Sequence, residues 1–158
     1  MLLTHWTREP FILRDYCYLQ TIDMKPNGLW FDVNHDWRRW VKREGMFQHE
    51  AWKARFKVRY RVELLDDRDI LYLSTPQALD NFTERFGVIP EHFKNILESD
   101  FVPLHHVEID WKKVTAQSTG IVITPYQWCR RLKLLWYYGW DCASGVCWTP
   151  RILQLSQR

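Results

Sequence analysis

FKVRYRVEL, residues 56–64, is the stretch of sequence that decides the fold class of this chain. Apolar and charged side chains alternate through it, so an extended backbone places the apolar ones, from Phe56 to Leu64, on one face. The opposite face carries Lys57, Arg59 and Arg61. The stretch therefore predicts a β-strand with one buried face and one basic face.

The flanking segments predict further short strands and helices. Asp66–Arg68 has the composition of a hairpin turn, so Ile70–Leu73 is expected to be the partner strand of 56–64. Thr75 and Pro76 have the composition of a helix start. The KPNG segment at Lys25–Gly28 predicts a turn, in which the Asn-Gly pair can adopt positive φ. Further strands are predicted at 2–6, 29–33, 120–123 and 146–148, and helices at 36–44, 76–86, 90–97 and after Asp110. This is the pattern of an α+β domain of about five or six short strands.

Length and composition indicate one domain, residues 1–158. Hydrophobic residues make up 46% and charged residues 26% of the chain, which excludes a largely disordered protein. No apolar run approaches the roughly 20 residues of a membrane span, and no signal-peptide pattern opens the chain, so we expect a cytoplasmic protein with no membrane partner. Nothing in the sequence points to secretion, so we expect free thiols. The spacing of Cys142 and Cys147 and the adjacent His105 and His106 predict no metal site. The cysteines are Cys17, Cys129, Cys142 and Cys147.

Aromatic and basic residues are the candidates for binding. Ten Trp residues favour an aromatic core, together with a site that stacks a flat ligand or a protein-binding surface. Trp37, Trp40 and Trp52 could form such a surface. A row of basic residues, spaced two apart, would lie on one face of an extended backbone and could bind successive phosphates. The alternative is that these residues form the solvated face of an edge strand, and the low net charge of +3 favours this alternative. The row comprises Lys53, Arg55, Lys57, Arg59 and Arg61.

Several enzyme classes lack their motifs in this sequence. There is no Walker loop, no GxGxxG, no G-x-S-x-G elbow and no zinc-deaminase H-x-E with P-C-x-x-C.

Three segments carry a family resemblance: LTHWT at 3–7, KPNGLWFD at 25–32 and WDCASGVCW at 140–148. Their order resembles that of the ADP-ribosyltransferases, on the branch of the poly-ADP-ribose polymerases and diphtheria-type toxins. That branch has a His on the first strand, an aromatic residue on the second and commonly a Glu on a late strand. Trp6 stands here where the family has Gly, Trp30 where it usually has Tyr, and Asp141 is the carboxylate near the late strand. The chain also resembles small phage proteins with KPxGLW and WYYGWDCASG segments, a likeness that implies no activity.

The resemblance implies a fold of two small, mostly antiparallel sheets that enclose a cleft. It implies NAD-dependent transfer of ADP-ribose to a macromolecular acceptor, either protein or nucleic acid, by a phage-encoded, toxin or anti-defence protein in the host cytoplasm. NAD or a related nucleotide would be the substrate.

The chemistry of the transfer suggests a role for each candidate residue. His5 would bind the ribose hydroxyls, the Trp6 backbone the carboxamide, and Trp30 the flat nicotinamide. Asp141 would stabilise the oxocarbenium-like transition state, and Ser144 would orient the acceptor. Thr7 would complete the nucleotide site, and Arg130 would hold the pyrophosphate. The alternative is a catalytically degenerate protein that binds a nucleotide or a partner on the same scaffold.

Overall fold

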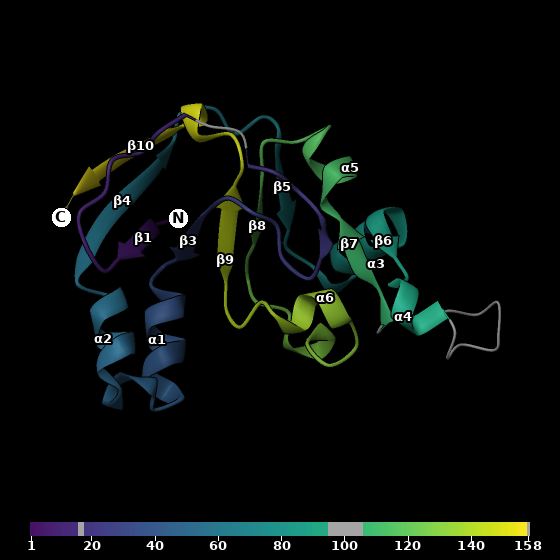
Figure 1. Cartoon of the computed structure of the whole chain (residues 1–158), viewed down its shortest axis with the longest axis horizontal. Helices are drawn as coiled ribbons and strands as arrows, with labels where there is room; N and C mark the ends of the chain where they lie inside the picture. The colour runs from purple at the N-terminus through teal and green to yellow at the C-terminus, as the bar shows by residue number, and fades with distance from the viewer. Residues whose placement is uncertain (16–17, 95–105, 158) are drawn as a thin grey trace.

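Two β-sheets of unequal size organise the structure, a computed structural model that describes residues 1–15, 18–94 and 106–157 (Figure 1). The large sheet is curled, and its neighbouring strands are antiparallel except for the parallel pair β5 and β8. Its strands, in spatial order, are β10 (Leu153–Gln157), β4 (Val58–Leu64), β1 (Leu3–Thr7), β3 (Leu29–Val33), β9 (Ser144–Cys147), β8 (Gly120–Ile123) and β5 (Ile70–Leu73). The small sheet consists of β2 (Ile22–Asp23), β7 (Glu108–Asp110) and β6 (Gly87–Val88).

Short helices accompany the sheets. The α-helices are α1 (Asp36–Arg43), α2 (Glu50–Arg55), α3 (Pro76–Phe86), α4 (Glu91–Lys94), α5 (Trp111–Thr115) and α6 (Leu135–Tyr138). The 3₁₀ turns that lie wholly in the described residues include η1 (Met46–Gln48), η3 (Trp128–Arg130) and η4 (Pro150–Ile152). The predicted α+β class is confirmed. Two small sheets were predicted, whereas one of the two sheets is large and contains seven strands. No helix in the described ranges is long and apolar enough to cross a membrane.

The alternating stretch forms β4, as predicted, but its neighbours differ from the prediction. Tyr60 and Val62 are buried, while Arg59 and Arg61 are exposed. β4 pairs with β1 on one side and β10 on the other, so it is not an edge strand. The predicted hairpin with β5 is therefore wrong: β5 lies at the far edge of the sheet, beside β8.

Strand register decides which side chains share a face of the sheet. Thr4 lies opposite Asp32, and Asp32 lies opposite Ser144. Because side chains alternate along a strand, Trp30 shares the face of Asp32, whereas His5 points to the opposite face. Helix α3 contacts β5, while α1 contacts β3 and α2 contacts β1. In Figure 1 the pair α1 and α2 lies below the ends of these strands, and α3 and α5 lie at the other side of the sheet.

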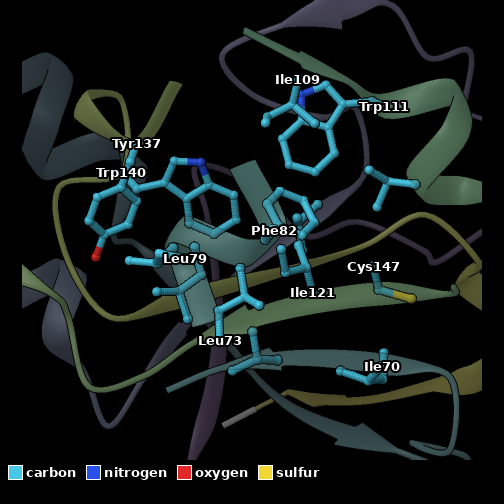
Figure 2. Close-up of a cluster of buried hydrophobic side chains, with 14 of the residues drawn as sticks. Ile70, Leu73, Leu79, Phe82, Ile109, Trp111, Ile121, Tyr137, Trp140 and Cys147 are labelled. Atoms are coloured by element: carbon cyan, nitrogen blue, oxygen red, sulfur yellow. The ribbon is translucent and has the colours of Figure 1, made fainter. Parts of the chain in front are cut away.

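The core lies between the sheet and α3. Figure 2 shows Leu79 and Phe82 of α3 beside Ile121 of β8 and Trp111 of α5. The aromatic-core interpretation is confirmed for four Trp residues, which are almost fully buried: Trp111, Trp136, Trp140 and Trp148. The side chain of Thr75 accepts a hydrogen bond from the backbone N–H of Ala78 at 3.1 Å, which confirms the predicted start of α3.

The turns differ from the sequence prediction. Positive φ occurs at Asn34 (52°) and His35 (62°), between β3 and α1, rather than at the Asn-Gly of the KPNG segment. Gly28 is needed there for another reason, since a Cβ on it would lie 2.6 Å from Val146 Cγ2 and 2.7 Å from the Cys147 carbonyl oxygen. The predicted helix 90–97 corresponds to α4, and its residues 95–97 lie outside the described residues. Cys17 and His105 also lie outside the described residues.

Candidate functional site

A pocket of about 300 Å³ lies between the helical pair α1 and α2 and the central strands β3 and β9. Five tryptophans dominate its wall, with charged and polar side chains among them. The tryptophans are Trp30, Trp37, Trp40, Trp52 and Trp140. The other lining residues are Lys25, Phe31, Arg55, Asp141, Cys142 and Ser144. We call this site the tryptophan pocket.

Local structure explains how these side chains converge. Trp37 and Trp40 are three residues apart on α1, so both lie on one side of that helix. Trp52 has the same relation to Arg55 on α2. Trp30 of β3 packs against Trp140, with ring centroids 4.7 Å apart and the planes inclined by 56°. The pocket therefore offers indole rings from three separate elements and from the segment after α6.

Charge at the tryptophan pocket is predominantly positive. Lys25 Nζ lies 5.2 Å from the centroid of the Trp30 ring, and burial lowers the pKa of Lys25 while the charge of Asp141 opposes that effect. Asp141 accepts a hydrogen bond from Arg131 Nη2 at 3.0 Å and forms an ion pair with it. Burial raises the pKa of Asp141, although Lys25 and Arg131 oppose the rise. With Asp141 already paired, Lys25 and Arg55 leave excess positive charge.

Two buried indole N–H groups have no hydrogen-bond partner within the described part of the chain, and both belong to pocket residues, Trp40 and Trp140. Buried indole N–H groups usually find an acceptor. The indoles of the core follow this rule: Trp136 donates to Thr83 Oγ1 at 2.8 Å, and Trp111 donates to the Asp23 carbonyl at 3.0 Å. Trp40 and Trp140 therefore differ from Trp136 and Trp111 in that their indole donors are unused.

Cys142 is not suited to nucleophilic catalysis. Burial, followed by the charges of Asp36 and Asp32, raises the pKa of its thiol far above the usual range. A thiol that stays protonated is a poor nucleophile.

Asp32 lies next to the pocket on β3, opposite Ser144. Its side chain is completely buried and accepts a hydrogen bond from Trp6 Nε1 at 3.1 Å. Burial raises the pKa of Asp32 to about 6, and the Trp6 hydrogen bond opposes the rise.

The structure brings together three of the residues named from the sequence: Trp30, Asp141 and Ser144 all line the tryptophan pocket. Ser144 is buried and donates from Oγ to the Cys142 carbonyl at 3.1 Å. Its hydroxyl is therefore already used within the protein.

The other predicted site residues lie outside the pocket wall. His5 packs against Phe11, with centroids 5.1 Å apart, and its Nδ1 lies 2.6 Å from the Trp30 carbonyl oxygen. Burial lowers the pKa of His5. Thr7 donates to the Glu9 carbonyl at 2.7 Å. Trp6 has its indole against Phe56, with centroids 5.5 Å apart.

Arg130 is occupied elsewhere in the molecule. Its guanidinium binds both carboxylate oxygens of Asp80, each at 2.7 Å. It is therefore not placed to hold a pyrophosphate in the tryptophan pocket.

Sequence reasoning assigned some pocket residues to other roles. Lys25 was assigned to the predicted turn 25–28, and Trp37, Trp40 and Trp52 were assigned to a surface for a partner. These three Trp side chains are half-buried and line the pocket. The spacing of Trp37 and Trp40 on α1 indicated that the two side chains share one side of the helix. It could not indicate that β3 forms the opposite wall of the tryptophan pocket.

No protein-family model matches this chain. No curated protein and no solved structure matches it either.

Proposed function

We propose that the tryptophan pocket binds a nucleotide, with the base between indole rings and a phosphate near Lys25 and Arg55. The observation that carries the proposal is the combination of five Trp side chains with two cations in one pocket of about 300 Å³. Indole faces stack flat aromatic rings. Lysine and arginine are suitable partners for phosphate oxygens.

Charge and size narrow the ligand class. Aromatic cages also bind quaternary ammonium groups, but Lys25 and Arg55 would repel such a cation. The volume is at the lower end of the roughly 300–1,000 Å³ of ligand pockets, which suits a mononucleotide or one half of a dinucleotide.

The test is calorimetric titration with AMP, nicotinamide mononucleotide, NAD and ADP-ribose, with choline as the cationic alternative. Trp30→Leu should weaken nucleotide binding about 5- to 100-fold, because stacking on one aromatic side chain contributes about 1–3 kcal/mol. Trp128→Leu is the matched control, since Trp128 is 53% exposed and does not line the pocket. Tight choline binding, or equal losses in both variants, would refute the proposal.

A second candidate is ADP-ribosyl transfer from NAD on an ADP-ribosyltransferase-like scaffold. The placement of Trp30, Asp141 and Ser144 in one pocket supports it. In this reaction the bond between ribose C1′ and the nicotinamide nitrogen breaks, and nicotinamide leaves with the electron pair. An acceptor oxygen or nitrogen, on a protein, a nucleic acid or water, then bonds to C1′ and loses its proton. Asp141 would stabilise the positive charge that develops on the sugar.

Release of nicotinamide from NAD, measured by chromatography with a cell extract as source of acceptors, tests this second candidate. Asp141→Asn should lower the rate about 10²- to 10³-fold while preserving side-chain shape. If the native protein releases no nicotinamide but still binds nucleotides, the binding function stands alone.

A further inference from the structure

Two neighbouring hollows that share His35 form a second site, away from the tryptophan pocket. One has a volume of about 490 Å³ and is lined by His35, Arg38, Arg39, Lys42 and Phe47. The other, of about 260 Å³, is lined by Leu2, Thr4, His35, Arg59 and Arg61. We call the pair the basic groove. It runs from the outer side of α1 to the basic face of β4.

Most cations of the basic groove lack a compensating carboxylate. Arg38, Lys42, Arg59 and Arg61 form no ion pair within the described ranges 1–15, 18–94 and 106–157. Arg39 alone is paired, with Asp36 at 2.9 Å. Four cations with no paired acid therefore line two hollows that share His35.

His35 at the centre of the groove responds to this charge. Burial lowers the pKa of His35, and the charges of Arg59, Arg38 and Arg39 lower it further. Its Nδ1 lies 3.4 Å from Thr4 Oγ1, which ties the end of β3 to β1. Three arginines thus act on His35 together, in addition to its burial.

The scaffold holds the arginines of β4 in a fixed order. Arg59 lies opposite Trp6, and Arg61 lies opposite Thr4, both paired to β1. Two residues apart on a strand, they repeat at about 7 Å along one face. Since β4 also pairs with β10, the basic residues are not protecting a free sheet edge, which was the alternative explanation for them.

We propose that the basic groove binds the phosphodiester backbone of a single-stranded nucleic acid. Two neighbouring hollows with four unpaired cations exceed what a single phosphate needs, and they suit a chain of phosphates. Phe47, half-buried in the wall of the larger hollow, offers an aromatic face for an unpaired base. This site shares no residue with the tryptophan pocket, so it is independent of the proposed nucleotide site.

Fluorescence anisotropy with labelled oligouridylate and oligothymidylate of about 16 nucleotides tests the proposal. Four phosphate contacts predict a slope of log K against log salt near −3, at about −0.7 per contact for single strands. The double variant Arg38→Gln, Arg59→Gln should reduce the magnitude of the slope by about 1.4 and weaken binding about ten-fold or more at low salt. Phe47→Ala should weaken binding about 5-fold or more without changing the slope.

The matched control is Lys112→Gln with Lys133→Gln, which removes two exposed cations away from the groove. This control should bind as the native protein does, with circular dichroism confirming that all variants are folded. Absence of binding at low salt, or equal losses in the double variant and the control, would overturn the proposal. Tighter binding of a duplex of the same length, or equal competition by polyglutamate, would also overturn it.

Discussion

At the scale of single residues, Asp32 is an acidic side chain that lies completely inside the protein. It is completely buried, and its Oδ1 has no hydrogen-bond partner in the part of the chain that the structure describes. Trp6 donates a side-chain hydrogen bond to the other oxygen, and a backbone hydrogen bond from Arg38 also lowers the pKa of Asp32. An ionised carboxylate in this position opposes folding, because burial removes its hydration without supplying an equivalent partner.

Asp32→Asn should therefore stabilise the protein at neutral pH. The pKa of Asp32 is about 6 in the folded protein against an ordinary 3.8, so the folded state binds the proton more tightly. Native stability should then fall as the pH rises from about 4 to about 6 and stay reduced above that. The gain in Asp32→Asn should be near zero at about pH 4 and rise to at most roughly 3 kcal/mol at neutral pH.

Urea denaturation of both proteins across this pH range measures the difference. A stability difference that does not depend on pH would show that Asp32 does not titrate in the folded state as described.

Gly28 makes a second prediction at this scale. A methyl group at Gly28 would overlap Val146 Cγ2 and the Cys147 carbonyl oxygen, at 2.6 and 2.7 Å. Gly28→Ala should lower the free energy of unfolding by about 1–3 kcal/mol, measured by urea denaturation. Gly139→Ala is the control, because its φ of −72° suits alanine and the nearest atom, 3.1 Å away, belongs to the flexible Lys25 side chain. Equal stability of the two variants would contradict the argument.

Much of the site could not be predicted from the sequence because it depends on strand register. His5 and Trp30 were placed in one cleft since both lie on early strands. A one-residue difference in register decides which face a side chain occupies, and the pairing of β1 with β3 directs these two apart. Trp30 and Asp141 were named from the resemblance to the ADP-ribosyltransferases, and both line the tryptophan pocket. The pairing of Asp141 with Arg131 could be seen only in three dimensions.

At the scale of elements, α3 and α6 are joined by one buried hydrogen bond. Trp136 of α6 donates to Thr83 Oγ1 at 2.8 Å, and Thr83 itself donates to the Leu79 carbonyl at 2.7 Å. Thr83→Val should destabilise the protein by about 1–3 kcal/mol, because the buried indole N–H loses its acceptor. Thermal or urea denaturation provides the measurement.

Thr119→Val is the matched control for this hydrogen bond. The Thr119 hydroxyl is buried without a partner in the described ranges, so its replacement by a methyl group should be neutral or stabilising. If Thr119→Val cost as much as Thr83→Val, loss of the hydrogen bond would not explain the effect.

Local signals predicted the elements better than their pairing. The bounds of β3 and β8 and the start of α3 follow from alternation, apolar runs and the Thr-Pro cap, all of which are properties of nearby residues. The prediction that β5 pairs with β4 was wrong, because β1 and β10 occupy the two sides of β4. β10 was missed because its alternation is short and its polar residues are exposed.

At the scale of the whole molecule, burial is concentrated in the middle of the large sheet. All residues of β8 and β9 are buried, whereas β10 at one edge carries exposed residues. Hydrogen exchange followed by mass spectrometry should find the slowest amides in β3, β9 and β8, opening only with global unfolding. Amides of β10 should exchange much faster. Equal protection in β10 and β9 would contradict the sheet order.

The position of β9 has a consequence for the protein during its synthesis. β9 is the strand that connects β3 to β8, yet it follows β3 in the chain by more than a hundred residues. At about 5–20 residues per second, a ribosome needs on the order of ten seconds to reach it after β3 has emerged. During that interval the nascent chain holds two incomplete sheets whose open edges can pair with other chains. Protection of those edges by a chaperone, rather than the stability of the finished fold, would then limit the yield of this protein in a cell.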